Sequence, residues 1–163
     1  MNRAIVLAAA LWGAVVADAD QRGTAGETMT VSPYGVGLII SDRSGFNAKL
    51  QNRTHALEFV LSFDAPDDYV YFHGDFIVQD VRPVPDGTLT GLVNTFWGFG
   101  LRADTPLRQA DRTELGVRLV FGAAYVLKEL PYEIFAHIAP TVNVAPSFSV
   151  FLAPGLGVRY LFR

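Results

Sequence analysis

In the segment PYEIFAHIAP, residues 131–140, the side chains alternate in a pattern that is not expected of a soluble protein. Side chains of an extended strand point alternately to opposite sides, so Tyr132 and Ile134 would lie on one face and Glu133 and His137 on the other. A water-soluble barrel of lipocalin type keeps its apolar face inside and a charged face outside. Here the second face mixes two ionisable groups with phenylalanine and alanine. That mixture favours a barrel with an apolar outside and a polar inside.

The same two-residue period recurs along most of the chain. Turn-forming residues separate eight extended segments, 34–40, 45–50, 54–63, 69–79, 92–103, 113–127, 132–144 and 148–162. No stretch of useful length has a helical period. Short connections between antiparallel strands predict an all-β protein, an up-and-down barrel that closes its own edges.

The two faces of the predicted strands differ in chemistry. One face is almost wholly aliphatic and aromatic, whereas the other consists of glycine, alanine and a few ionisable groups. This distribution predicts a transmembrane barrel with lipid outside and a polar lumen. The predicted lumen charges are Lys49, Glu58, His73, Asp75, Arg102, Glu114, Arg118, Glu133, His137 and Arg159.

Aromatic side chains gather at the predicted strand ends on the apolar face. Tyrosine and phenylalanine at these positions are typical of the girdles that membrane barrels place at both water–lipid interfaces. The predicted girdle consists of Tyr34, Phe46, Phe63, Tyr125, Tyr132, Phe148, Tyr160 and Phe162.

The N-terminus has the pattern of an export signal. Arg3 precedes an apolar run over residues 4–17, which is shorter than the ~20 residues that span a bilayer and ends in a small-x-small motif. We therefore expect a cleaved signal peptide over residues 1–19, a flexible leader over 20–32 and a barrel domain over 33–163. Export and an inside-out barrel together predict the bacterial outer membrane.

Five stretches of the chain resemble a known family. They are GVGLIISDRSGFNAKL, YFHGDFIV, FWGFGLRAD, LGVRLVFGAAYVLKELPYEIFAHIAPTVNV and APGLGVRYLF. They resemble a family of small, mostly uncharacterised bacterial outer-membrane proteins with eight-stranded barrels like the OmpA transmembrane domain. The resemblance covers residues 33–162 and implies fold and location, without catalytic residues to carry over. Residues 80–91 would be a turn at the periplasmic end, although a long one.

Charges inside a dry barrel are costly unless they are paired. We therefore expect a salt-bridge network that plugs the lumen, with Arg118 and Arg159 neutralised by Glu114, Glu133, Glu58 or Asp75, and the sequence does not show which carboxylate pairs with which arginine. The leading hypothesis is a structural or surface-interaction role. The first alternative is a small gated pore for ions or small solutes, and the second is a lipid-modifying enzyme.

The sequence offers little for catalysis. His73 and Asp75 would share a face, with Ser62 as the nearest candidate nucleophile, but a catalytic triad is recognised only by its geometry. The three histidines lack metal-ligand spacing, and the chain has no cysteine. We expect no enzymatic activity, no cofactor and no metal.

The composition also limits the partners. A net charge of −3 without a basic patch argues against nucleic acid. The expected partners are outer-membrane lipids and, during biogenesis, the barrel-assembly machinery. We expect a monomer.

Overall fold

The computed structural model describes residues 32–64, 69–83, 91–107 and 113–162. The predicted signal peptide and almost all of the predicted leader lie outside the described residues. The described part of the chain contains no helix that is long and apolar enough to cross a bilayer.

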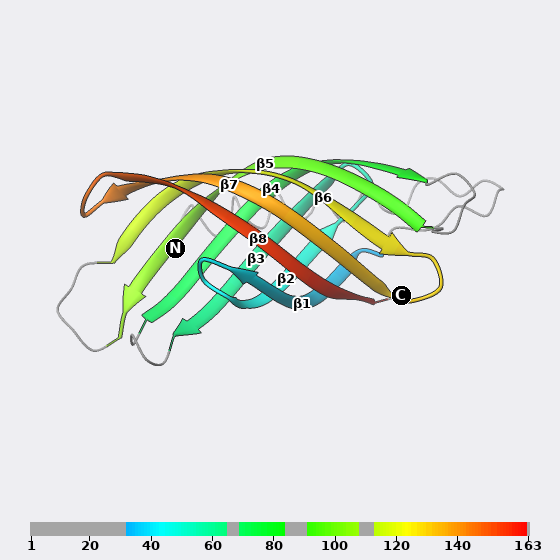
Figure 1. Ribbon diagram of the computed structural model, residues 1–163, viewed down its shortest axis with the longest axis horizontal. Helices are drawn as coiled ribbons and strands as arrows, with labels where there is room; N and C mark the ends of the chain where they lie inside the picture. The colour runs from blue at the N-terminus through cyan, green and yellow to red at the C-terminus, as the bar shows by residue number, and fades with distance from the viewer. Residues whose placement is uncertain (1–31, 65–68, 84–90, 108–112, 163) are drawn as a thin grey trace, which may run out of the picture.

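Eight antiparallel strands close into one barrel in sequence order (Figure 1). Each strand pairs with its sequence neighbours, and β1 pairs with β8 to close the sheet. The strands are β1 (Tyr34–Ser41), β2 (Gly45–Gln51), β3 (His55–Asp64), β4 (Tyr69–Pro83), β5 (Gly91–Pro106), β6 (Glu114–Leu127), β7 (Tyr132–Ala145) and β8 (Ser149–Phe162). The predicted eight-stranded up-and-down barrel is confirmed.

The predicted turn over residues 80–91 was wrong in extent. β4 continues to Pro83, and Asp80 pairs with Thr95 while Pro83 pairs with Leu92. The polar, proline-containing sequence is typical of a turn, but pairing with β5 overrides that local preference. Proline is tolerated here because it ends the strand.

β5 also extends further than predicted, to Pro106. Asp104, expected in a turn, lies in the strand opposite Tyr71 of β4 and Glu114 of β6. Its side chain is buried, so one more carboxylate enters the barrel than the sequence pattern indicated.

The strands expose their apolar faces and bury their polar faces. On β5, Trp97, Phe99 and Leu101 are 53%, 59% and 67% exposed. On β6, Leu119 is 50% exposed, whereas Arg118 beside it is only 3% exposed. With a period of two residues, the apolar side chains therefore point outward and the charged side chains point inward.

The interior is filled by side chains of mixed size. Phe96, Phe135 and Tyr71 lie inside together with alanine, valine and isoleucine side chains. A Cβ added at Gly157 would lie 2.3 Å from the Phe135 ring, and one at Gly100 would lie 1.9 Å from the Asp75 carboxylate. Inward glycines thus make room for the large groups opposite them.

Candidate functional site

The first charge cluster inside the barrel centres on Arg159, and we call it the Arg159 cluster. Arg159 Nη1 donates to Glu133 Oε1 at 2.8 Å, and Arg159 Nη2 lies 2.6 Å from Glu58 Oε1. Lys49 Nζ donates to the same Glu133 oxygen at 3.2 Å. Asn47 accepts from Arg159 Nε and donates to Glu58 at 2.8 Å. Two cations and two carboxylates thus balance in a space closed to solvent.

Two aromatic rings complete the surroundings of these cations. The Arg159 guanidinium lies 3.6 Å from the Phe135 ring centroid, and Lys49 Nζ lies 6.0 Å from that of Phe96. A cation over an aromatic face is attracted by the ring quadrupole, most strongly where water is absent. The inward aromatic residues therefore stabilise the cations as well as filling space.

A second group, the Arg118 cluster, joins three strands. Arg118 Nε lies 3.4 Å from Asp75 Oδ1. Arg118 Nη1 donates to His73 Nδ1 at 2.9 Å and to the Tyr71 hydroxyl at 3.3 Å. Arg118 Nη2 lies 3.4 Å from His137 Nε2. One guanidinium therefore contacts a carboxylate, a phenol and two imidazoles.

The contacts of Arg118 determine the histidine tautomers. A guanidinium only donates, so the ring nitrogens that face it must accept. His73 then carries its proton on Nε2, which lies 3.6 Å from Asp75 Oδ2. His137 likewise accepts at Nε2. Both imidazoles are neutral in this arrangement.

A third group, the rim cluster, lies where the β1–β2 turn meets β5. Arg102 contacts Asp104 at 3.3 Å and Asp42 at 3.9 Å. Arg43 contacts the same Asp104 oxygen at 3.2 Å. Asp104 was absent from the predicted set because its sequence position suggested a turn, and only the pairing of β5 with β4 reveals it.

Glu114 differs from the other predicted carboxylates. Glu58 and Glu133 contact Arg159, and Asp75 contacts Arg118. Glu114 is only half-buried and instead accepts from Asn143 Nδ2 at 3.1 Å.

Uncharged amides fill the end of the barrel where β1 begins. Asn94 Nδ2 donates to Gln79 Oε1 at 2.8 Å, and Gln79 Nε2 donates to Gln51 Oε1 at 3.3 Å. Gln51 in turn donates to the Ser32 carbonyl at 3.1 Å. Sequence reasoning that followed ionisable groups missed this amide layer.

The predicted girdle residues lie on the outside at both ends of the barrel. Tyr132 and Tyr160 pack edge to face with ring centroids 5.6 Å apart, and Tyr160 packs on Phe162 at 5.2 Å. Tyr125 is half-buried. The other exposed members are Tyr34, Phe46, Phe63 and Phe148.

The candidate nucleophile does not reach the histidine. Ser62 pairs with Tyr71 across the β3–β4 ladder, and its hydroxyl donates to the Ser44 carbonyl at 2.5 Å. Within the described residues, no group of three or more His, Cys, Asp or Glu side chains could hold a metal ion.

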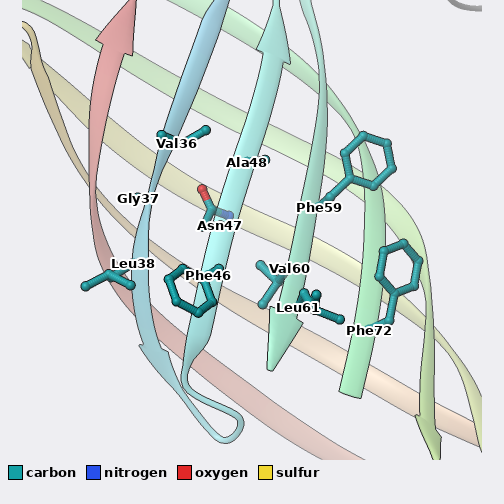
Figure 2. A pocket seen from close by; sticks show the side chains of 10 residues that line it. All are labelled: Val36, Gly37, Leu38, Phe46, Asn47, Ala48, Phe59, Val60, Leu61 and Phe72. Atoms are coloured by element: carbon teal, nitrogen blue, oxygen red, sulfur yellow. The ribbon is translucent and has the colours of Figure 1, made fainter. Parts of the chain in front are cut away.

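A shallow apolar groove of about 520 Å³ crosses the outside of β1–β4 (Figure 2). Ala48 lies at its middle, between the larger outward side chains of Val36 and Phe59. Phe46 and Phe72 lie further along it. Asn47 is the one polar residue among those drawn in Figure 2, and its side chain is buried on the inward face.

Comparisons with known proteins give no relative for this chain. No family model, no curated protein and no solved structure matches it. The closed eight-stranded barrel is therefore established by the structure alone.

Proposed function

We propose that this protein is a bacterial outer-membrane barrel with a structural or surface-interaction role, whose lumen is closed by its own charges. The observation that carries the proposal is the inverted distribution of side chains. Arg159, Glu133 and Lys49 are each 1% exposed, while the outward faces carry large exposed apolar groups. These include Trp97, Phe99, Leu101, Leu119, Phe121, Ile138 and Leu156.

Water would solvate this exterior poorly. Soluble monomers rarely expose a contiguous apolar patch beyond a few hundred Å², and here the apolar side chains encircle the barrel. Hydrocarbon accepts the same surface without cost. Where its strands are paired, the closed sheet also satisfies the backbone without help from water, as a membrane-spanning strand requires. The groove on β1–β4 would be filled by lipid chains.

The filled interior favours a closed barrel rather than a pore. The amide layer, the Arg159 cluster and the Arg118 cluster are stacked inside, with the rim cluster at the far end. Eight strands leave an interior that side chains can just fill. Arg118, Arg159 and Asn94 of these layers are each at most 3% exposed, which supports a closed lumen.

Heat modifiability tests the location. The full chain would be expressed in a Gram-negative host, and its outer-membrane fraction would be run unboiled and boiled on SDS gels. A folded membrane barrel resists SDS and shifts position only after boiling. A single unshifted band in the soluble periplasmic fraction would refute the proposal and favour a soluble barrel with an apolar ligand cavity.

A further inference from the structure

β8 extends past the end of its neighbour β1 at one end of the barrel. β1 pairs with β8 only as far as Ser41, opposite Gly155, whereas β7 follows β8 to Ser149. Residues 149–154 therefore lack a neighbour on one side. The β7–β8 hairpin projects past the β1–β2 turn (Figure 1). At the β4–β5 seam of the same end, by contrast, Tyr69 and Pro106 are paired and the strands end level.

The backbone groups that face the open side can be identified. Leu161 N donates to Pro131 O at 2.7 Å, on the β7 side of β8. Successive residues of a strand direct their backbone groups to opposite sides, so the even-numbered residues of β8 face β1. Val150 and Leu152 thus present both N–H and C=O to the open side, and Pro154 presents its C=O. No described residue supplies a backbone partner for them there.

The side chains beside this edge are apolar on the outside. Val150 and Leu152 are 63% and 58% exposed. Phe151 faces inward, with the Arg102 guanidinium 4.9 Å from its ring centroid. Unpaired backbone groups next to an apolar face are costly in hydrocarbon, and in water they are a template for strand pairing.

We propose that this open edge, residues 150–154 of β8, binds an extended segment of another protein by adding it as a strand. Only an extended polypeptide repeats N–H and C=O at the spacing that Val150 and Leu152 present. Its residues opposite these two would be apolar and face outward. The residues between them would be small, because they face Phe151 and Ala153 inside the wall.

Antiparallel pairing with the same edge of a second copy does not fit a membrane barrel. Antiparallel pairing of one edge with itself requires a two-fold axis perpendicular to the sheet. That axis would insert the two copies in opposite orientations, whereas copies in one membrane share an orientation. The exclusion of self-pairing rests on the proposed membrane location. The unpaired edge of β8 does not depend on that location.

The test uses the full chain, folded in detergent micelles, and a dye-labelled peptide that alternates valine and alanine between terminal lysines. Fluorescence anisotropy measures binding. The matched control is the same peptide N-methylated at alternate residues, which keeps the side chains and removes edge hydrogen bonds. We expect the control to bind at least about tenfold more weakly. The unmethylated peptide should also slow hydrogen exchange at Val150 and Leu152.

A barrel variant provides the second comparison. Its β1–β2 hairpin is lengthened until β1 covers Val150, and its folding is checked by the heat shift on gels. We expect it to lose peptide binding. Equal binding of both peptides, or unchanged exchange at Val150 and Leu152, would overturn the proposal. So would a peptide-free dimer that protects these two amides. The heat shift reports on the membrane barrel separately.

Discussion

At the scale of single residues, Arg159 has the largest predicted effect on stability. It contacts Glu58 and Glu133 at 2.6 and 2.8 Å, and its guanidinium is fully buried. Removing one partner of a buried ion pair leaves an uncompensated charge and costs about 3–5 kcal/mol. We expect Arg159→Ala to lower the free energy of unfolding by that amount in urea titrations in lipid vesicles.

The matched control is Arg82→Ala. Arg82 also pairs with a carboxylate, that of Asp80, but its side chain is 77% exposed. An exposed pair contributes little, so this variant should unfold like the wild type. Equal losses in the two variants would show that the buried cluster does not stabilise the barrel.

Gly157 supplies a second residue-scale prediction. A Cβ there would lie 2.3 Å from the Phe135 ring and 2.6 Å from the Leu38 carbonyl oxygen. Because the backbone oxygen cannot move away cheaply, Gly157→Ala should destabilise the barrel by about 1–3 kcal/mol. Gly74 is the control, since its Cβ would lie 3.3 Å from Phe59 on the outside. Urea unfolding of both variants makes the comparison, and an equally small effect would contradict close packing at Gly157.

Single residues also show which features of the charge clusters could be predicted from the sequence. Alternation alone placed Arg159 and Glu133 on the inward face. It could not pair them, because the partners of an inward side chain depend on strand stagger around the closed barrel. The Asp104 carboxylate was missed for a related reason: local composition suggested a turn, and only pairing with β4 extends β5 through it.

At the scale of the elements, the alternation of side chains gives each strand an apolar outward face and a polar inward face. Leu119 lies outward in the middle of β6, opposite Phe99 of β5. An arginine at the midplane of a membrane barrel costs about 2–4 kcal/mol, and the cost falls to about 0–1 kcal/mol near the interfaces. Leu119→Arg should therefore reduce folding into lipid vesicles, measured by the heat shift.

The control for this strand-scale prediction is Thr95→Arg. Thr95 also faces outward but lies near the end of the barrel, opposite Asp80. It should fold nearly as well as the wild type. Improved soluble yield of Leu119→Arg, without loss of folding, would instead indicate a water-exposed wall.

Strand ends were harder to predict from sequence than strand cores. The cores repeat the two-residue period, while the ends at Asp80–Pro83 and at 104–106 have polar or proline-containing sequences and are held by their neighbours. The two strands of the β1–β2 hairpin were each predicted one residue too short, and the effect of this short hairpin on β8 was not predicted. The open edge of β8 becomes visible only when β1 and β8 are in register.

At the scale of the whole molecule, closure of the interior decides between a plug and a pore. In the proposed plug, the amide layer, the Arg159 cluster and the Arg118 cluster fill the lumen together, so loss of one layer leaves the others in place. We expect no step conductance for the full chain in planar bilayers across a range of salt concentrations. Arg118→Ala should remain silent too, because the Arg159 cluster still blocks the path. Steps in the wild type that change when Arg118 or Glu133 is neutralised would establish a conducting lumen and refute the plug.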